Sequence, residues 1–460
     1  MTTPRTTQAP VTEDVKPTRR ELLGLSTAAA GAWATSAWQS ALAADGPEPV
    51  RTAVIGTGGR GSDLIRSLTT IEGCDLAAIA DDYPPHLEKA SKFAGPQAKL
   101  YANYRKLLDE VKPQAVVVAV PLHLHYQVAS DAIAAGVDVF CEKTMCYTVD
   151  EARKLADEVA GSKRVFQVGL QRRANPIYQQ AAAMVQAGVL GQITAVKAQW
   201  HRNNNWRRPV PVPKGDSDWS RLERKLNWRL YREYSGGLMT ELGSHQLDVV
   251  NWMLGDVPRK VTATGGVDYW RDGREVCDNV FCIYEYELPP FAGPRPEANA
   301  AATSAAGTPE SSLKPYTVRV MYSSLCNNAY EGAAELIMGT KGSLYLTSGK
   351  GLFYREKLAD DVGWSAKKTA DGGGADASVV TSGKTLKLSN SPWAHRGEPL
   401  EIDNLLGDDT RDELVSFLDH VRRGDPATIC DAREGLRDTA TVLTANRAVD
   451  EGTSLTIPRV

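Results

Sequence analysis

A short segment of the chain carries residue types suited to acid–base chemistry. Glu241, His245 and Asp248 follow a glycine pair in the stretch GGLMTELGSHQLDVV, at spacings of four and three residues. On an α-helix, these spacings place the three side chains along one narrow stripe. An imidazole between two carboxylates can exchange protons near neutral pH. The segment therefore predicts a relay in which Asp248 orients His245 while Glu241 and His245 face a substrate; the alternative is a solvated polar face.

A lysine at a predicted strand end extends this set. Lys143 follows Glu142 and the apolar run 137–141. An ammonium group at the end of a buried strand can donate a proton or a hydrogen bond to a substrate oxygen. Burial beside a cation would lower its pKa from the ordinary value of about 10.4. We predict Lys143, Glu241 and His245 as catalytic residues; for Lys143 the alternative is a surface salt bridge.

A glycine-rich turn indicates a dinucleotide. Gly56, Gly58 and Gly61 form the pattern G-x-G-x-x-G between an apolar run and a stretch with helical periodicity. The first glycine allows a tight turn, the second lets a diphosphate approach, and the third lets helix and strand pack closely. Asp81, twenty residues later, can accept hydrogen bonds from a ribose diol and would repel a 2′-phosphate. The pattern predicts NAD as the cofactor, ahead of NADP.

Further residues are expected at the same edge of the sheet. The segment PLHLH follows the apolar run AVVVAV. Its H-x-H spacing could suggest a metal ion, but a turn without a third nearby ligand does not favour one, and no metal site is predicted. The expected cofactor contacts are Gly56, Thr57, Gly58, Gly59, Arg60, Gly61, Asp81, Asp82, Pro121, His123, His125, Glu142 and Lys143.

The sequence around these residues predicts two different sheets. Apolar runs at 53–55, 76–80, 115–120, 137–141 and 165–168 alternate with helical patterns at 62–68, 125–135 and 151–160. This alternation is typical of a doubly wound parallel sheet. Beyond residue 171 the expected strands become longer and antiparallel, at 194–200, 261–265, 280–287, 317–323, 334–338 and 342–347, with helices at 176–187, 412–423 and 433–450.

We therefore predict an α/β protein of two domains. A Rossmann domain is expected at 50–171, followed by an α/β domain with a large, open, mostly antiparallel sheet at 172–460. Two stretches rich in small residues, 289–314 and 359–399, are predicted as flexible insertions. A length of 460 residues agrees with two domains. The net charge of −3 does not favour nucleic-acid binding, and the seven scattered cysteines do not favour a disulfide framework.

The first 44 residues have the pattern of an export signal. Arg19 and Arg20 precede an uncharged, alanine-rich segment that reaches Ala44 and contains the small-x-small sequence Ala41-Leu42-Ala43. The pattern predicts a cleaved twin-arginine signal peptide at 1–44, with the twin-arginine export machinery as partner and a periplasmic or otherwise exported location. The alternative is a membrane anchor. This route carries folded proteins, which suits an enzyme that binds its cofactor before export.

From about residue 50 to 460 the chain resembles the Gfo/Idh/MocA family. The resemblance rests on AVIGTGGRG, VAVPLHLH, GVDVFCEK, GLQRRANPIY and GGLMTELGSHQLD, in that order. It implies a sugar or polyol held over the nicotinamide, and an open sheet that carries the contacts of a homodimer or homotetramer. The family's lysine in its Glu-Lys-Pro motif corresponds to Lys143, and its aspartate–histidine pair to Glu241 and His245. Thr144 and Glu241 depart from the family's proline and aspartate.

Polar and aromatic side chains are expected to bind the sugar. Such side chains are concentrated in WHRNNNWRRP (200–209) and LNWRLYREY (226–234), where indole faces could stack on the sugar and polar groups could bind its hydroxyls. The alternative is that the tryptophans belong to the core or to a subunit interface. The predicted substrate contacts are Arg172, Tyr178, His201, Asn204, Trp228, Tyr231 and Asp248.

Together these features predict an NAD(P)-dependent oxidoreductase acting on a sugar, glycoside or polyol. His245 would take the hydroxyl proton, and Lys143 would hydrogen-bond the same oxygen. Because free NAD is not expected to be abundant outside the cytoplasm, the cofactor should stay tightly bound and be regenerated in the site. Two alternatives stay open: an NAD-dependent glycoside hydrolase that oxidises, eliminates and re-reduces its sugar without net redox change, and a non-catalytic sugar-binding protein.

Overall fold

The computed structural model describes residues 48–291, 314–356, 398–400 and 408–460. The predicted signal peptide at 1–44 lies outside the described residues. The predicted insertions at 289–314 and 359–399 lie almost wholly outside them. Within the described ranges, no helix is long and apolar enough to cross a membrane.

The first sheet has six strands, all parallel, in the order β3-β2-β1-β4-β5-β6. The order reverses between β1 and β4, so a crevice opens beyond the carboxyl ends of these two strands. The predicted doubly wound sheet is thus confirmed. Its strands are β1 (Val50–Ile55), β2 (Cys74–Ala80), β3 (Lys99–Tyr101), β4 (Ala115–Val118), β5 (Asp138–Glu142) and β6 (Phe166–Gly169).

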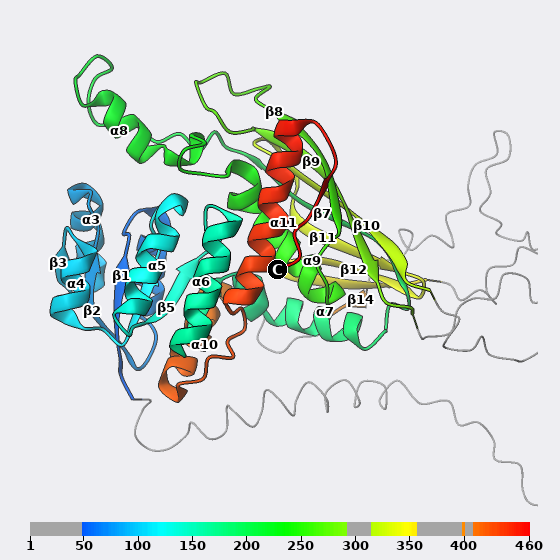
Figure 1. Ribbon diagram of the computed structural model, residues 1–460, viewed down its shortest axis with the longest axis horizontal. Helices are drawn as coiled ribbons and strands as arrows, with labels where there is room; N and C mark the ends of the chain where they lie inside the picture. The colour runs from blue at the N-terminus through cyan, green and yellow to red at the C-terminus, as the bar shows by residue number, and fades with distance from the viewer. Residues whose placement is uncertain (1–47, 292–313, 357–397, 401–407) are drawn as a thin grey trace, which may run out of the picture. The chain divides into compact units, whose positions relative to one another are not determined.

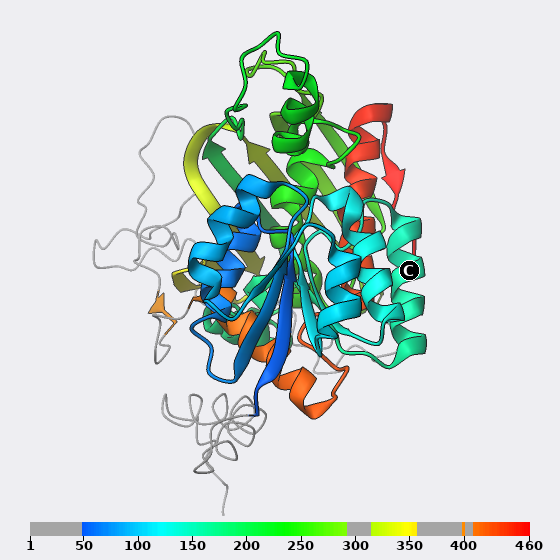
Figure 2. The ribbon, with the colours of Figure 1, turned by 90° about the vertical axis from the view of Figure 1, so that its left-hand side faces the viewer.

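Helices cover both faces of this sheet (Figure 2). They include α2 (Gly59–Leu68), α3 (Pro84–Ala94), α4 (Tyr104–Val111), α5 (His125–Ala134) and α6 (Val149–Ser162). The sequence patterns missed α3, β3 and α4. Helix α3 buries only Ala90 and Ala94, so its apolar periodicity is faint, whereas α4 is only eight residues long.

The second sheet has nine strands in the order β14-β13-β12-β11-β7-β10-β9-β8-β15. Its neighbouring strands are antiparallel except for β7 and β10, which run parallel. The predicted mostly antiparallel sheet is therefore confirmed. The strands are β7 (Ile193–Asn203), β8 (Lys260–Gly266), β9 (Asn279–Leu288), β10 (Tyr316–Leu325), β11 (Asn327–Gly339), β12 (Gly342–Thr347), β13 (Lys350–Arg355), β14 (Glu398–Pro399) and β15 (Leu455–Thr456).

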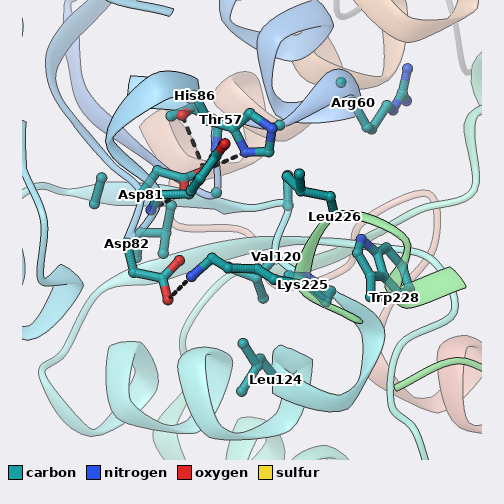
Figure 3. A pocket seen from close by; sticks show the side chains of 18 of the residues that line it. Thr57, Arg60, Asp81, Asp82, His86, Val120, Leu124, Lys225, Leu226 and Trp228 are labelled. Atoms are coloured by element: carbon teal, nitrogen blue, oxygen red, sulfur yellow. Dashed lines mark hydrogen bonds and ion pairs between the residues drawn. The ribbon is translucent and has the colours of Figure 1, made fainter. Parts of the chain in front are cut away.

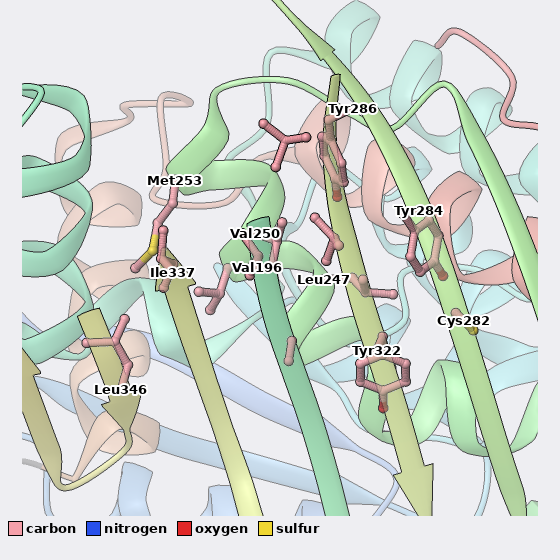
Figure 4. Close-up of a cluster of buried hydrophobic side chains, with 14 of the residues drawn as sticks. Val196, Leu247, Val250, Met253, Cys282, Tyr284, Tyr286, Tyr322, Ile337 and Leu346 are labelled. Atoms are coloured by element: carbon pink, nitrogen blue, oxygen red, sulfur yellow. The ribbon is translucent and has the colours of Figure 1, made fainter. Parts of the chain in front are cut away.

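The two faces of the second sheet differ. One face packs against α7 (Pro176–Gln186), α9 (Ser244–Leu254) and α11 (Ala432–Glu451) and buries a large apolar cluster (Figures 1 and 4). On the other face Phe281, Ile283 and Met321 remain 47–49% exposed, and Met321 pairs directly with Ile283 across β10 and β9. These three side chains therefore form an apolar patch without a covering layer in the described chain, beside charged side chains such as Arg319 and Glu285.

A helix from the end of the chain returns to the first sheet. Helix α10 (Asp409–Arg423) packs Leu414, Phe417 and Leu418 into the cluster on one face of the parallel sheet. The rings of Phe417 and Phe140 lie 5.7 Å apart between centroids. By its packing α10 belongs to the first sheet, although the predicted second domain, 172–460, included it.

Candidate functional site

A cavity of about 580 Å³ lies at the carboxyl ends of β1, β2 and β4. The glycine-rich turn forms one wall, and a segment of the second domain forms another (Figure 3). Its position is the reversal point of the parallel sheet, where dinucleotides bind in doubly wound folds. The cavity lining includes Gly56, Thr57, Gly58, Gly59, Arg60, Asp81, Asp82, Pro121, Leu124, Arg208, Lys225, Trp228 and Arg229.

The glycine-rich turn leaves room for a diphosphate. Gly56 has a φ of 92°, and a Cβ there would lie 2.6 Å from the carbonyl of Ala119. A Cβ on Gly61 would lie 1.9 Å from the oxygen of Gly56, whereas one on Gly58 would meet nothing closer than 3.7 Å. Helix α2 begins here with no side-chain cap and no acidic residue in its first turn. Its N–H groups therefore remain available to an anion, so the residues fit a dinucleotide.

Asp81 stands where a ribose is expected. Its carboxylate accepts hydrogen bonds from the main-chain N and Oγ1 of Thr57 at 2.7 and 3.1 Å, and from the main-chain N of Tyr83 at 2.8 Å. Burial raises the pKa of Asp81, but hydrogen bonds from His86, Thr57 and Tyr83 outweigh burial and lower it. Asp81 is therefore ionised at neutral pH. Its neighbour Asp82 forms an ion pair with Lys225 at 2.6 Å.

Five of the predicted cofactor contacts do not line this cavity: Gly61, His123, His125, Glu142 and Lys143. His125 is buried, and its two ring nitrogens lie 2.9 Å from the main-chain oxygens of Thr144 and Val120. His123 stacks against Tyr234, with ring centroids 4.8 Å apart. The prediction is wrong for His125, because both of its ring nitrogens are used by the main chain; for His123 it stays a prediction. From the same PLHLH segment, Pro121 and Leu124 line the cavity instead.

Arg60 forms ion pairs with two carboxylates of the protein. Its guanidinium pairs with Glu142 at 2.6 Å and with Glu413 of α10 at 3.0 Å. Burial would lower the pKa of Arg60, but the two carboxylates raise it above its ordinary value. Arg60 and Glu142 thus connect the glycine-rich turn to β5 and α10, which makes them positioning residues of the turn.

The three predicted catalytic residues come together. The Nζ of Lys143 donates a hydrogen bond to the main-chain oxygen of Glu241 at 2.9 Å. The carboxylate of Glu241 accepts one from the Nε of Arg229 at 2.7 Å. His245 lies one helical turn further on, with its ring 5.3 Å from that of Trp200. A loop of the first domain therefore meets a helix of the second at this point.

The charge states of the three residues follow from burial and from their neighbours. Burial, followed by the positive charges of Lys143 and Arg172, lowers the pKa of His245 well below its ordinary range. Burial lowers the pKa of Lys143, with Glu241 opposing. Burial would raise the pKa of Glu241, but Arg229 and Lys143 lower it. At neutral pH the imidazole of His245 is therefore neutral and the carboxyl of Glu241 is ionised.

The three residues lie next to the cavity, but they are not in its described lining. Arg229 and Trp228 do line it, and Arg229 contacts Glu241. Arg229 therefore forms the boundary between the cavity and the acid–base residues. The peptide bond between Lys143 and Thr144 is cis, and the Thr144 hydroxyl donates to the main-chain oxygen of Thr240 at 3.1 Å.

The predicted relay is wrong at Asp248. Its two carboxylate oxygens accept three hydrogen bonds of 2.7–3.0 Å from Arg173. The Nδ1 of His245 is buried and has no hydrogen-bond partner among the described residues. The predicted regular helix is also interrupted, because Met239–Gly243 forms a π-helix before α9 begins. Such π-turns occur often at functional sites.

Three predicted sugar contacts are packing residues. The hydroxyl of Tyr178 is buried and donates to Glu335 at 2.7 Å, and that of Tyr231 donates to Glu223 at 2.7 Å. His201 bonds through both ring nitrogens to neighbouring strands of the second sheet. The prediction is wrong for these three because each polar group is used inside the second domain.

The remaining predicted sugar contacts have different surroundings. Arg172 is mostly buried and pairs with Asp409 at 3.0 Å. Asn204 accepts a hydrogen bond from the main-chain N of Trp206 at 2.6 Å, which closes a tight turn. Trp228 lines the cavity, with the guanidinium of Arg229 4.2 Å from its ring.

The cations of the cavity wall that sequence reasoning missed include Arg208, Lys225 and Arg229. All three lie in or beside the two aromatic stretches singled out for sugar binding, but no spacing rule selects them from the many arginines there. The seven cysteines are free thiols. The described residues contain no group of three or more His, Cys, Asp or Glu side chains that could hold a metal ion.

A six-stranded parallel sheet with a glycine-rich turn at its reversal point, joined to a large open sheet that contributes acid–base residues, defines a two-domain dinucleotide-binding protein. Residues 50–170 match the family model described as an oxidoreductase family, NAD-binding Rossmann fold, and residues 182–457 match the model described as its C-terminal alpha/beta domain. The chain belongs to the Gfo/Idh/MocA oxidoreductase family, and its first domain is a NAD-binding Rossmann domain.

Known relatives agree with this assignment. Inositol 2-dehydrogenase 1 of Saccharopolyspora erythraea is 35% identical over 156 residues, which are 34% of this chain and 46% of that protein. The rhizopine catabolism protein MocA of Rhizobium meliloti is 27% identical over 209 residues, 45% of this chain and 58% of its own. The match thus spans about half the length of these relatives.

A solved structure shares the fold. Levoglucosan dehydrogenase in complex with NADH and levoglucosan matches with a TM-score of 0.62 at 17% identity, covering 90% of this chain and all of that one. At this level of identity the likeness shows the architecture.

Proposed function

We propose that this protein oxidises a CH–OH group of a sugar, glycoside or polyol and transfers the hydride to a tightly bound NAD. The observation that carries the proposal is the meeting of Lys143 from the first domain with Glu241 and His245 from the second, beside the wall of the dinucleotide cavity. The inositol dehydrogenases among its relatives and the levoglucosan dehydrogenase fold support a sugar or polyol substrate.

We assign a separate role in proton transfer to each of His245, Lys143 and Glu241. NAD, when bound, supplies the hydride acceptor. His245 is neutral at physiological pH and can accept the proton of the substrate hydroxyl. Lys143 can donate a hydrogen bond to the same oxygen and stabilise the negative charge that develops on it. Glu241, held ionised by Arg229, provides a negative charge beside Lys143.

Alanine variants of the two central residues test this proposal. We expect Lys143→Ala and His245→Ala each to lose turnover by roughly 10²- to 10⁴-fold, while NADH affinity changes little. Lys154→Ala, on the exposed side of α6, is the matched control. Steady-state turnover and NADH fluorescence titration give the two readouts. Near-normal turnover in either active-site variant would remove that residue from the mechanism.

The same purified protein separates the dehydrogenase from its two alternatives. Formation of NADH from a free sugar or polyol supports the dehydrogenase. Release of the aglycone from an aryl glycoside, without NADH accumulation, contradicts it in favour of a hydrolase without net redox change. Sugar binding with neither activity would indicate a binding protein. Gel filtration followed by absorbance measurement tests whether NAD remains bound through purification.

We also propose that residues 1–44 direct export by the twin-arginine route to the periplasm or beyond. The support is the Arg19-Arg20 pair before an uncharged segment. A reporter carrying residues 1–44 should leave the cytoplasm, and replacement of both arginines by lysine should retain it there. Export of the double variant at the normal rate would contradict this proposal.

We propose a homodimer or homotetramer formed through the uncovered face of the second sheet. Its support is the adjacent, half-exposed apolar side chains of Phe281, Ile283 and Met321. Light scattering after gel filtration should give a multiple of the chain mass, and Ile283→Lys should reduce it. An unchanged assembly in this variant, with its fold intact, would place the interface elsewhere.

A further inference from the structure

A segment of the second domain faces the glycine-rich turn across the cavity. It comprises residues 208–229 and includes α8 (Trp219–Leu226); we call it the strap. Arg208, Lys225 and Trp228 of the strap line the cavity together with the glycine-rich turn (Figure 3). Neither Arg208 nor Lys225 takes part in the proposed proton and hydride transfer. Because the strap comes from a different domain, it can contact a bound dinucleotide from the side opposite to the sheet.

The guanidinium of Arg208 lies beside the glycine-rich turn, where the diphosphate of a dinucleotide is expected. One of its guanidinium nitrogens lies 3.8 Å from the position that a Cβ of Gly59 would occupy. This guanidinium has no hydrogen bond or ion pair with the described residues. In contrast, the preceding Arg207 is paired with both Glu223 and Asp272. Arg208 is therefore a free cation beside the N-terminus of α2, and both groups favour an anion between them.

The main chain at Arg208 is fixed by a buried side chain. Its N–H donates to the Oδ1 of Asn227 at 2.5 Å, and its carbonyl accepts from the Nδ2 of Asn227 at 3.1 Å. Asn227 is only 2% exposed. The position of Arg208 over the turn is thus built into the strap, although its side chain reaches into solvent-accessible space.

A second contact joins the strap to the first domain. The Nζ of Lys225 lies 2.6 Å from the Oδ2 of Asp82, directly after the ribose-side Asp81. The Asp82 side chain is 76% exposed, and such exposed pairs add little to stability. Its location matters more: Lys225 of α8 reaches Asp82 beyond the end of β2, so the pair joins the two walls of the cavity (Figure 3).

We propose that Arg208 binds the diphosphate of NAD and that the Asp82–Lys225 pair holds the strap closed over the cofactor. A guanidinium matches phosphate oxygens in a bidentate manner. The strap therefore slows cofactor release, which is the retention that the proposed function requires and on which this inference rests. Lys225 acts as a positioning residue, and Arg208 as a cofactor-binding one.

The test measures cofactor binding and does not depend on turnover. NADH affinity and dissociation rate are followed by fluorescence in the full chain. Arg208→Gln should weaken NADH binding by roughly 10- to 100-fold, the range of a charge-assisted hydrogen bond, and Arg208→Lys should recover part of the loss. Arg221→Gln, in an exposed residue of α8 that does not line the cavity, is the matched control. Circular dichroism checks that each variant is folded.

ADP-ribose locates the contact. It carries the diphosphate without the nicotinamide, so Arg208→Gln should weaken it by the same factor as NADH. A loss confined to NADH would move Arg208 to the nicotinamide and overturn the diphosphate assignment. Unchanged affinity for both probes would overturn the role of Arg208 altogether.

The strap closure has its own variants. Asp82→Lys and Lys225→Asp should each speed NADH dissociation several-fold, and the double exchange should restore the slow rate. If the two single variants and the double exchange all released NADH at the wild-type rate, or all at the same increased rate, the proposed closure would be overturned. Failure of the proposed function is distinguishable, because an enzyme that binds NADH tightly through Arg208 but oxidises no sugar leaves this inference standing.

Discussion

We expect Glu335 to make the stability of the protein depend on pH near neutrality. This glutamate lies on β11, is fully buried, and accepts a hydrogen bond from the hydroxyl of Tyr178 at 2.7 Å. Its other carboxylate oxygen has no partner among the described residues. Burial raises the pKa of Glu335 to about 7, although Arg172, Tyr178 and Gln246 act in the opposite direction.

The sign and size of the effect follow from linkage. The ordinary pKa is 4.5, so the folded state holds this proton more tightly than the unfolded state does. The contribution is fully present below pH 4.5 and is lost as the pH rises through about 7. At about 1.4 kcal/mol per pKa unit, the loss amounts to about 3 kcal/mol.

The perturbation is Glu335→Gln, which cannot ionise but keeps an oxygen that can accept the hydrogen bond of Tyr178. Relative to the wild type, the variant should gain about 3 kcal/mol in unfolding free energy between pH 4.5 and pH 8. Urea unfolding across this interval measures the difference. Infrared titration provides a second readout: because Glu413 and Asp438 are also buried carboxyls with a raised pKa, the band of protonated carboxyls at pH 6 should be weaker in the variant than in the wild type, but not absent.

Glu287→Gln, an exposed glutamate of the same sheet, is the control and should not alter the pH profile. Parallel profiles of the wild type and Glu335→Gln, together with an unchanged infrared band, would refute the reasoning. In that case Glu335 would be ionised in the folded protein, and its partners would compensate for the cost of burial.

Three further substitutions have defined outcomes. Gly61→Ala places a Cβ 1.9 Å from the oxygen of Gly56 and should abolish NADH binding in a fluorescence titration. Asp248→Asn breaks a buried ion pair with Arg173 and should lower the urea unfolding free energy by about 3 kcal/mol. Thr148→Ala removes the capping box of α6 and should cost about 1 kcal/mol, measured in the same way.

Each has a contradicting result. Wild-type NADH affinity in Gly61→Ala would mean that the turn can open without loss of function. Unchanged stability of Asp248→Asn would mean that Arg173 is satisfied by Glu434 alone. For Thr148→Ala, no change would mean that water replaces the cap.

The parallel sheet could be predicted because its strands are continuous apolar runs. The first four residues of AVVVAV become β4 and are buried, and the glycine pattern lies between β1 and α2 as expected. The missed elements α3 and β3 bury few side chains, so their apolar signal is weak, whereas α4 and α8 are only eight residues long and give little periodicity to read. The strand β13 was also missed, because its short run of KGLFYR does not show a clear alternation.

The site was harder to predict, because partners come from distant parts of the chain. The types of Lys143, Glu241 and His245 suggested chemistry, and the structure brings them together. The sequence pattern could not foresee that Asp248 is bound by Arg173, 75 residues away. Nor could it show that the hydroxyl of Tyr178 is used by Glu335, 157 residues away. The type of a residue limits the chemistry that its side chain can perform. The neighbours of that side chain in the folded protein determine whether its polar groups are free to perform it.

The return of α10 to the first sheet has a consequence for synthesis on the ribosome. One face of that sheet, on which α2 and α3 also pack, stays incompletely covered until Leu414, Phe417 and Leu418 have emerged. The nucleotide-binding half therefore cannot mature while the rest is still being translated, even though its strands are made first. Nascent chains stalled before residue 409 should remain sensitive to protease in residues 50–170, and protection should appear only once α10 has left the exit tunnel.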